Sequence, residues 1–437
     1  MKIMRSIFWF KRDLRVEDNR ALIKCLRESD EVYPIFIFCE DILEDLKAFD
    51  NRLCFVRSAV EELKKTIPLS VFYGKDTEIF EYLIDLLRPK RIYTASALSW
   101  SGSERILKIK TLCKEKGVEF VEVFDNFLVD VRKIDYTKIF TPFYKKWINH
   151  VDSTLEPFEE NLSKKAKKIQ TDKFQIPEKI RNLKVTGDFF WTLDFLNQRL
   201  TSFDFKSYKE LRNRLDIDGT SKLSPYIRFG IVSVRKIFQL VKGLSETYIK
   251  ELAWREFWYH IRHYFPEMKN LEFQEKRRNL NWSYNDEIIE KFIKAETGYP
   301  IIDAAIRQLK QENWMHNRAR MIVGSFLTKD LLIDWRIGER FFAENLLDYD
   351  EVVNTGNWQW IASVGPDPKP LRIFNPLLQA KKFDPNCYYI KKYIPELKNS
   401  ECIELLDPLK FRIKGYFPPI VNHYERVKKI REIFKNM

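Results

Sequence analysis

Residues 3 to 10 read Ile-Met-Arg-Ser-Ile-Phe-Trp-Phe, the first of five short runs that are rich in β-branched or aromatic residues. The other runs lie at 32 to 38, 69 to 73, 91 to 95 and 119 to 123. Amphipathic segments of helical length separate the runs, such as 52 to 65 and 103 to 116. Strands that alternate with helices usually pair in parallel, so this order predicts a doubly wound, parallel α/β sheet.

The composition changes after the fifth run. The chain has 437 residues, which is more than one hydrophobic core normally organises. Between about 150 and 188, Lys, Glu, Asp and Pro replace most large apolar residues, which indicates a connector. Beyond Phe189 the apolar residues follow helical spacing, with long loops expected near 350 to 376. We therefore predict an α/β domain over 1–130, an interdomain connector over 131–188 and an all-α domain over 189–437.

The formal net charge of +13 favours a polyanionic partner, because lysine and arginine displace the counterions that condense on nucleic acid. An AT-rich genome that favours lysine would give the same excess, so the charge alone leaves both explanations open. The chain shows neither a signal-peptide pattern nor a run of about 18 apolar residues. We expect a soluble, cytoplasmic monomer.

The six cysteines form no Cys-x-x-Cys pair and have no spacing typical of metal ligands. We expect buried free thiols in a reducing compartment. His260 and His263 have a ligand-like spacing, but no acidic or cysteine partner accompanies them. No metal site is predicted.

Three clusters marked by tryptophan stand out in the second half of the chain. Residues 251 to 258 read Glu-Leu-Ala-Trp-Arg-Glu-Phe-Trp, which places a carboxylate, a cation and two indoles on one helix face. Residues 314 to 321 read Trp-Met-His-Asn-Arg-Ala-Arg-Met, and residues 354 to 360 read Asn-Thr-Gly-Asn-Trp-Gln-Trp. An ordinary core face would be aliphatic. These faces predict a site for something flat with polar edges.

These clusters resemble those of the photolyase/cryptochrome family, and specifically the class I cyclobutane pyrimidine dimer (CPD) photolyases. The resemblance also rests on the stretches at 9–19, 219–226, 297–303 and 372–376, which stand in the family's order. It covers nearly the whole chain and implies an α/β domain followed by a helical domain that binds FAD. The implied function is light-dependent repair of CPDs in UV-damaged DNA, in which photoexcited reduced FAD gives an electron to a flipped-out dimer.

The resemblance also leaves alternatives. A cryptochrome-type blue-light receptor without repair activity would share much of the sequence, although plant-type members often have Asp where this chain has Asn354. A photolyase for (6-4) lesions would be expected to have histidine at Asn317. The stretch 96 to 103 lacks most of the usual contacts to a second, light-harvesting chromophore. A folate, a deazaflavin, another flavin or an empty cleft therefore all remain open.

The family pattern, carried over position by position, implies four sets of site residues. The catalytic set is Glu251, Asn317, Trp254, Met321 and Trp360. The FAD-binding set is Tyr208, Thr220, Ser221, Lys222, Leu223, Ser224, Tyr248, Arg320, Asp348, Asp350 and Asn354. The electron-transfer set is Trp282, Trp335 and Trp358, and the DNA-binding set is Arg212, Arg255, Trp258, Arg318, Arg372 and Gln379.

Two of these assignments have a plain structural alternative. The stretch 219 to 225 predicts a helix start with Ser224 as the cap and Pro225 at the first helical position, which suits a phosphate but also any ordinary helix. Glu251 is expected to stay neutral by burial against the indoles and to stabilise charge on the dimer, but it could instead be a surface glutamate paired with Arg255.

Overall fold

The N-terminal part of the chain is a five-stranded parallel sheet with the order β3-β2-β1-β4-β5. The computed structural model describes residues 3–45, 50–367, 369 and 371–435. The strands are β1 (Arg5–Phe10), β2 (Glu31–Cys39), β3 (Ser70–Gly74), β4 (Arg91–Ala95) and β5 (Glu119–Val123). All five predicted strands are confirmed, and their bounds differ from the prediction by no more than two residues.

Helices cover both faces of this sheet, as a doubly wound fold requires. Phe8 and Phe10 of β1 pack against α1 (Arg20–Glu28) and α3 (Asp50–Thr66) on one face. Ile7 and Trp9, which alternate with them, pack against α4 (Asp76–Leu87) and α5 (Trp100–Glu115) on the other. The short helix α2 (Glu40–Asp45) follows β2 directly. The predicted fold class of this part is confirmed.

The segment between the two parts packs on both of them. It contains η1 (Val131–Lys133), α6 (Phe140–Asn149), α7 (Glu160–Ser163) and α8 (Glu178–Arg181). The Trp147 indole N–H of α6 donates to Glu256 of the helical part at 2.7 Å. Further along, Ala166 forms a parallel bridge with Val32 of the sheet. These contacts give the segment we predicted as a connector a share in the packing of both parts.

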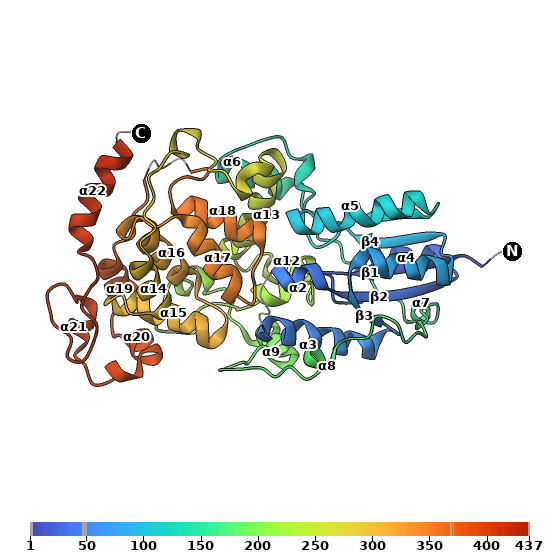
Figure 1. Cartoon of the computed structure of the whole chain (residues 1–437), viewed down its shortest axis with the longest axis horizontal. Helices are drawn as coiled ribbons and strands as arrows, with labels where there is room; N and C mark the ends of the chain where they lie inside the picture. Colours follow the sequence, from blue (N-terminus) through green and yellow to red (C-terminus); the bar gives the residue numbers. More distant parts are fainter. Residues whose placement is uncertain (1–2, 46–49, 368, 370, 436–437) are drawn as a thin grey trace.

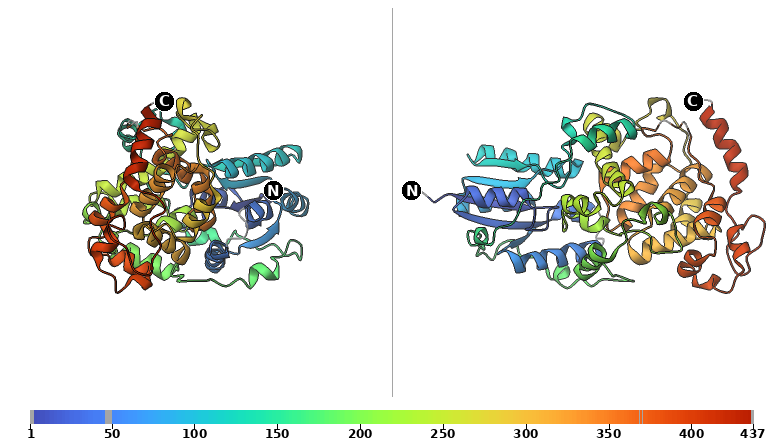
Figure 2. Two further views of the ribbon diagram at one scale, coloured as in Figure 1. Left: turned by 60° about the vertical axis from the view of Figure 1, so that its left-hand side comes forward. Right: turned by 180° about the vertical axis from the view of Figure 1, so that it is seen from behind.

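The rest of the chain is helical, as predicted, and forms the larger end of an elongated molecule (Figures 1 and 2). Its α-helices up to α15 are α9 (Leu193–Ser202), α10 (Tyr208–Leu211), α11 (Ser224–Arg228), α12 (Val234–Val241), α13 (Glu246–Tyr264), α14 (Asp286–Lys294) and α15 (Pro300–Glu312). Then follow α16 (Asn317–Ser325), α17 (Trp335–Asn345), α18 (Glu351–Ile361), α19 (Pro376–Phe383), α20 (Tyr388–Tyr393), α21 (Cys402–Leu406) and α22 (His423–Lys435). Shorter turns are η2 (Pro266–Lys269), η3 (Glu275–Arg277), η5 (Pro395–Leu397) and the π-helical η4 (Phe326–Asp330).

The prediction of long loops over 350 to 376 was wrong for residues 351 to 361. Residues 351 to 361 form α18, whose first turn is capped by Asp350 through hydrogen bonds from the N–H groups of Val352 and Val353. Gly356 lies inside this helix because α13 passes close to it. A Cβ there would meet the Trp258 ring at 2.4 Å. Gly356 is therefore a point of close helix packing and does not mark a loop.

The motif at 9–19 joins the two parts of the molecule. Arg15 and Arg235 share the carboxylate of Asp125, and Arg235 also binds Asp18 at 2.8 Å. All four side chains are at least nine-tenths buried. Gly230 lets the backbones touch, since it has φ of +63° and a Cβ there would lie 2.2 Å from the carbonyl oxygen of Arg12. Each buried charge offsets the desolvation cost of an opposite one, so this motif stabilises the boundary between the two domains.

The motif at 297–303 is also structural. Buried Asp303 accepts hydrogen bonds from the N–H and hydroxyl of Thr297, from the N–H of Gly298 and from the Tyr416 hydroxyl. Burial raises the pKa of Asp303 to about 6. The contacts tie the start of α15 to the chain near residue 416.

The prediction that all the cysteines are free was wrong for two of them. Cys387 and Cys402 form a disulfide across a separation of 15 residues, between the start of α20 and the start of α21. Cys25, Cys39, Cys54 and Cys113 are free and buried, as expected. Within the described residues, no helix combines the length and the apolar character needed to span a bilayer.

Candidate functional site

The start of α16 places one polar atom in the interior without a partner. His316 caps the helix, and its Nδ1 accepts a hydrogen bond from the N–H of Arg318 at 3.0 Å. The proton therefore sits on Nε2, which is buried and has no hydrogen-bond partner. Burial, followed by the positive charges of Arg318 and Lys222, lowers the pKa of His316 to about 3. The residue is a neutral imidazole with a free donor, and it was not among the predicted site residues.

A second buried atom without a partner lies on the same side of α16. Arg320 donates from Nη2 to Oδ2 of Asp348 at 2.8 Å, and from Nε to the carbonyl oxygen of Met315. The other carboxylate oxygen, Oδ1 of Asp348, is buried and unpartnered. The two unpartnered atoms are a donor and an acceptor. Native interiors rarely leave such groups unpaired, so both atoms are available to a ligand.

Asn354 on α18 is held through its amide nitrogen. Nδ2 donates to the main-chain oxygen of Glu339 at 3.1 Å and to its carboxylate at 3.0 Å. The Tyr349 hydroxyl also donates to that carboxylate. Burial raises the pKa of Glu339. Because both amide hydrogens are used, Oδ1 of Asn354 is the atom left for a ligand, and Glu339 is the residue that orients it.

Asp350 has a different setting from the other acidic residue predicted to bind FAD. Besides capping α18, it accepts a hydrogen bond from the Tyr259 hydroxyl at 2.7 Å and lies 3.5 Å from Arg228. Although burial alone would raise its pKa, Arg228 and other cations lower the pKa of Asp350. Its oxygens have protein partners, and its neighbours face the interdomain cavity described below.

The stretch at 219–223 is irregular chain that leads directly into α11, which begins at Ser224. Thr220, Ser221 and Leu223 are buried, and the Ser221 hydroxyl lies 2.8 Å from the hydroxyl of Tyr248. Tyr208 packs edge-on against Tyr248, with ring centroids 4.9 Å apart.

Two further residues at this helix start, Lys222 and Ser224, belong to the predicted FAD-binding set. Lys222 has a positive φ of 55°, and its ammonium lies 5.6 Å from the Trp314 ring. The prediction that Ser224 caps the helix was wrong. Ser224 is the first residue of α11, it makes no cap, and its hydroxyl accepts a hydrogen bond from the indole of Trp314.

The predicted catalytic residues lie at the surface end of this cluster. Glu251 forms an ion pair with Arg212 at 2.5 Å and keeps 30% of its side chain exposed. Its partner is therefore Arg212, and burial against indoles is not what holds it. Asn317 is exposed, and its Nδ2 lies 3.9 Å from the sulfur of Met321. The carboxylate, the guanidinium and the amide can each hydrogen-bond a polar group brought from solvent.

Trp254 and Trp360 supply flat, partly exposed rings. Phe140 from α6 stacks on Trp254 with ring centroids 3.8 Å apart and an angle of 4° between the planes. This support comes from the segment between the domains, so it could not be predicted from the residues around Trp254. The guanidinium of Arg372 lies 4.2 Å from the Trp360 ring and also pairs with Asp367.

Two of the predicted DNA contacts are not at the rim. Trp258 is 1% exposed and packs against Gly356, so it belongs to the core. Arg255 points to the other side of α13, where it donates to the carbonyl oxygen of Asn126 and covers the Phe127 ring at 4.7 Å. The family resemblance implied both roles, and helical spacing alone would place both residues near Glu251. In the fold, helix α18 and the chain at 126–127 cover them.

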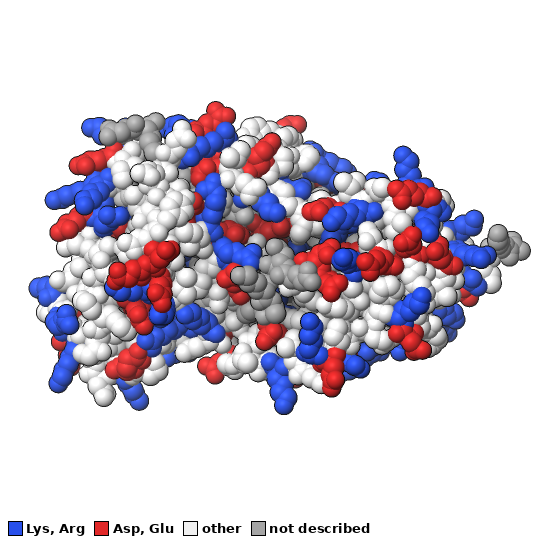
Figure 3. Space-filling model, in the orientation of Figure 1, with Lys and Arg blue, Asp and Glu red and all other residues white. Residues whose placement is uncertain are grey.

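The remaining predicted cations are accessible. Arg318 donates to Asn213 at 2.8 Å and reaches Gln379 at 3.5 Å, so these two predicted DNA contacts lie side by side. Figure 3 shows that Lys and Arg mix with Asp and Glu over the described residues of one face of the molecule.

The three tryptophans predicted to carry electrons are all buried. Trp358 is packed edge-on against Phe342, with centroids 4.9 Å apart. Trp335 donates its indole N–H to Glu272 at 3.1 Å. Trp282 is 7% exposed and sits in the same hydrophobic core as the other two.

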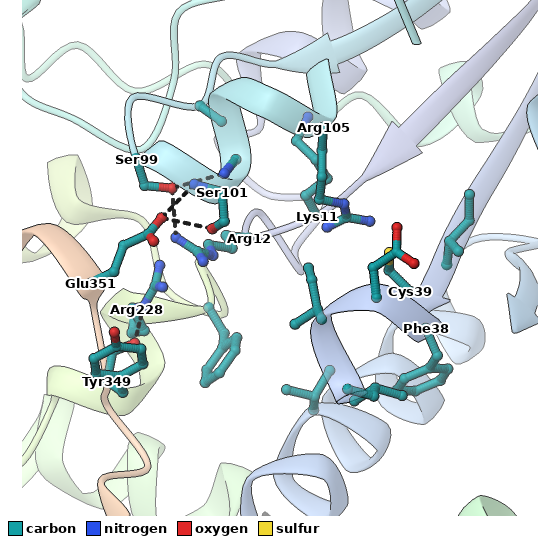
Figure 4. Close-up of a pocket in the computed structure, with 18 of the residues that line it drawn as sticks. Lys11, Arg12, Phe38, Cys39, Ser99, Ser101, Arg105, Arg228, Tyr349 and Glu351 are labelled. Carbon is teal, nitrogen blue, oxygen red and sulfur yellow. Dashed lines mark hydrogen bonds between the residues drawn. The ribbon is translucent and has the colours of Figure 1, made fainter. Parts of the chain in front are cut away.

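A cavity of about 1050 Å³ lies between the sheet and the helical part. It is lined by the carboxyl ends of β1, β2 and β4 and by residues of the helical part (Figure 4). In doubly wound folds, this edge of the sheet is the usual place for a ligand. The volume suits a molecule of dinucleotide size.

Cations stand on two sides of this cavity (Figure 4). Arg105 is held by Asp76, and burial lowers the pKa of Lys11 to about 7. Arg12 donates to the Ser99 hydroxyl at 3.3 Å, and burial lowers its pKa to about 10. Charge buried at this cost indicates an anionic group as the ligand.

Comparison with known proteins shows which family this chain belongs to. Residues 6–163 match the family model described as DNA photolyase, and residues 248–436 match the FAD binding domain of DNA photolyase. A deoxyribodipyrimidine photo-lyase of Alkalihalophilus pseudofirmus is 34% identical, over 98% of this chain and 97% of that protein. The chain belongs to the DNA photolyase family.

Solved structures agree with this assignment. The archaeal photolyase of Sulfolobus tokodaii superposes with a TM-score of 0.91 at 32% identity, over 99% of this chain and 100% of that chain. That structure is described as having two FAD molecules, with the implication of a novel light-harvesting cofactor. A bacterial class III photolyase from Agrobacterium tumefaciens has a TM-score of 0.87 at 27% identity, over 100% of this chain and 98% of that chain. These structures support the family assignment and include photolyases of more than one kind.

The residues present fit the FAD that the family binds. The free donor of His316, the free acceptor of Asp348 and the free amide oxygen of Asn354 suit a ring system with both kinds of polar edge. Arg320 adds positive charge next to them. Among the described residues, no group of three or more His, Cys, Asp or Glu side chains is placed to hold a metal ion.

Proposed function

We propose that this photolyase repairs cyclobutane pyrimidine dimers in DNA by light-driven electron transfer. The observation that carries the proposal is the ion pair of Glu251 with Arg212, one helical turn before the partly exposed ring of Trp254 on α13. Asn317 and Trp360 add an exposed amide and a second partly exposed ring. Rings of this kind stack on bases that have left the duplex. Polar groups beside them can hold the carbonyl groups of a dimer.

The chemistry of the dimer suits these groups. A dimer that has received an electron carries negative charge on its carbonyl oxygens. Donors already in place where such charge develops are worth roughly 3 kcal/mol each in the barrier. Arg212, held by Glu251, and the amide of Asn317 are such donors. Asn317 also favours CPDs over (6-4) lesions, because the latter reaction requires a proton from an imidazole.

FAD, bound and reduced, supplies the electron. Arg320, paired with Asp348, would hold it by charge, and Asn354, oriented by Glu339, would contact its polar edge. The hydroxyls of Thr220 and Ser221 would face its phosphates. Trp358, Trp335 and Trp282 would pass electrons inward from the surface, since indole is oxidised reversibly.

The interdomain cavity would hold a second chromophore, and we propose a flavin nucleotide with phosphate groups. Lys11 and Arg105 on one side, and Arg12 and Arg228 on the other, favour an anionic ligand of this size (Figure 4). A folate could also enter, but its glutamate tail would use fewer of these cations. Extraction of chromophores from the purified protein, with analysis of their masses, distinguishes the two. Loss of the second flavin in the double variant Arg12→Ala and Arg105→Ala is expected.

The repair proposal is tested with chemically reduced protein, irradiated DNA and a measurement of remaining thymine dimers. Dimers should disappear in light and persist in darkness. Glu251→Gln should slow repair by about 10²-fold while FAD stays bound, because it loses the ion pair that fixes Arg212. Glu246→Gln on the same helix is the matched control, since Glu246 is exposed and pairs only with Lys250.

Two results would contradict the proposal. Protein that binds FAD and absorbs light without removing dimers would support the blue-light receptor instead. Equal repair by the Glu251→Gln variant and the control would remove Glu251 from the reaction.

A further inference from the structure

Trp335 has a charged environment that the other two tryptophans of the relay lack. Its indole Nε1–H donates to Oε1 of Glu272 at 3.1 Å, and Glu272 is 2% exposed. The guanidinium of Arg336 lies over the Trp335 ring, 4.7 Å from its centroid. Arg336 also pairs with the same oxygen of Glu272 at 2.9 Å. A base touches the indole N–H, and a cation faces the ring.

The contrast with Trp282 and Trp358 is clear in the hydrogen bonds. The Nε1 atoms of both are buried and have no hydrogen-bond partner among the described residues. All three indoles are buried, so burial alone does not explain why the N–H of Trp335, of these three, has a carboxylate partner. Only at Trp335, of these three, can an N–H proton move directly to a carboxylate.

Loss of an electron changes the acidity of an indole. A neutral indole holds its N–H proton very tightly, whereas the oxidised radical cation gives it up readily. Arg336 makes a positive charge on the Trp335 ring unfavourable, since two positive charges would lie about 5 Å apart. Glu272 stands where that proton would go. Proton loss removes the charge conflict and leaves a neutral radical.

We propose that Glu272 accepts the Nε1 proton of oxidised Trp335. In the FAD-loaded protein under light, Trp358 gives one electron to the flavin, and one electron then passes from Trp335 to oxidised Trp358. The Nε1–H bond of Trp335 breaks, and the proton forms an O–H bond with the Glu272 carboxylate. The products are a neutral Trp335 radical and a neutral Glu272. A thiol in solution later returns one electron, and the proton moves back to Nε1. This inference rests on the electron relay of the proposed function.

The surroundings of Arg336 allow Glu272 to become neutral. Arg336 also contacts Asp334 at 3.2 Å and donates to the carbonyl oxygen of Asn270 at 2.6 Å. The guanidinium therefore keeps a carboxylate and a carbonyl partner after Glu272 is protonated. With the proton displaced, the electron can return to Trp335 only together with a proton, so the charge separation lasts longer.

The test is time-resolved absorption of the FAD-loaded protein after a light pulse. Cationic and neutral tryptophan radicals have different visible spectra. The wild-type protein should form the neutral radical, and form it more slowly in deuterated water. Glu272→Gln, which still accepts the hydrogen bond but is a much weaker base, should lose the neutral radical and keep the cation. Glu275→Gln, three residues away and exposed, is the matched control.

A second readout does not depend on FAD. The indole N–H resonance of Trp335 in the NMR spectrum of the apoprotein, assigned with Trp335→Phe, should shift in Glu272→Gln and stay in place in Glu275→Gln. This establishes the hydrogen bond and the folding of the variant.

Equal yields and rates of the neutral radical in wild type and Glu272→Gln would overturn the inference. So would a neutral radical that survives in Trp335→Phe. If the wild type forms no tryptophan radical at all, the inference also fails. Dimer repair by chemically reduced protein would then still be present, so this failure is distinct from failure of the proposed function.

Discussion

Two motifs of this chain have similar charge but differ in whether all of their carboxylate oxygens are bound. In the motif at 9–19, Arg15 and Asp18 are bound by Asp125 and Arg235, so each buried charge faces an opposite one. In the motif at 314–321, the Nε2 atom of His316 is buried without a partner, and so is Oδ1 of Asp348 next to Arg320. Every carboxylate oxygen of Asp18 and Asp125 accepts a hydrogen bond, so the acceptors of the first cluster are complete within the protein, although Nε of Arg15 and Nη1 of Arg235 are also buried without a partner. The second cluster is incomplete, because it leaves a carboxylate oxygen and a neutral imidazole N–H unbound, and this free acceptor beside a free donor is what indicates a binding site.

The largest effect should be on stability, and it should come from the cluster of Arg15, Asp18, Asp125 and Arg235. Asp125→Ala leaves Arg15 and Arg235 buried without the carboxylate they share, and removal of one member of a buried ion pair costs about 3–5 kcal/mol of unfolding free energy. Chemical denaturation should therefore have a much lower midpoint. Asp135→Ala is the control, because the Asp135 side chain is 92% exposed. An unchanged midpoint would show that the cluster does not hold the domains together.

The next largest effect should be on FAD binding rather than on stability, and it concerns the incomplete cluster of His316, Arg320 and Asp348. Asp348→Ala removes the partner of Arg320 and the free acceptor, so FAD should bind about 30-fold or more weakly, corresponding to about 2 kcal/mol. Equilibrium dialysis of the apoprotein with FAD measures this. Glu344→Ala, which removes a partly exposed partner of Arg340, should leave the affinity unchanged. Equal affinity in both variants would mean that FAD does not use Asp348.

The third effect is a dependence of stability on pH in the apoprotein. The pKa of His316 is about 3 in the folded protein and about 6.5 when unfolded. Between these values the unfolded chain binds one more proton, so stability is complete above about pH 6.5 and falls as the pH decreases toward 3. The loss from this group should be about 2 kcal/mol between pH 6.5 and 5.

The measurement is the denaturation midpoint as a function of pH. His316→Gln should have a smaller loss of stability over this range than the wild type. His150→Gln, which changes an exposed histidine, should keep the full loss. Saturation with FAD should also reduce the difference, since the ligand gives Nε2 a partner. Parallel curves for wild type and His316→Gln would contradict the assignment.

The sequence predicted the fold well because hydrophobic periodicity is a local property. The strands and the helical character beyond Phe189 follow from it directly. It could also predict which residue types gather in the site. It could not predict the partner of Glu251, because Arg212 lies 39 residues earlier and is brought in by the fold. Nor could it show that Cys387 and Cys402 meet.

Two of the predicted DNA contacts, Trp258 and Arg255, lie away from the rim for one physical reason. Helical spacing places Trp258 and Arg255 near the face of Glu251, but it does not say which neighbours cover that face. Helix α18 covers Trp258, and the chain at 126–127 covers Arg255. His316 was visible in its motif, and its place directly before the predicted helix could have indicated a cap. Its free Nε2 could be recognised only with the tertiary structure.

The smallest effect should come from Phe140, which belongs to neither motif. Its ring supports Trp254 from behind, and a stacked aromatic pair contributes about 0.5–1.5 kcal/mol beyond its burial. Phe140→Leu keeps the apolar contact but removes the stacking, so damaged DNA should bind a few-fold more weakly, with FAD affinity unchanged. Filter binding measures the affinity of each variant for irradiated DNA and for undamaged DNA. A loss that is equal for the two DNAs would show that Phe140 acts on general DNA affinity. A loss of affinity confined to irradiated DNA would show that the site for damaged DNA includes a ring supplied by the segment between the domains.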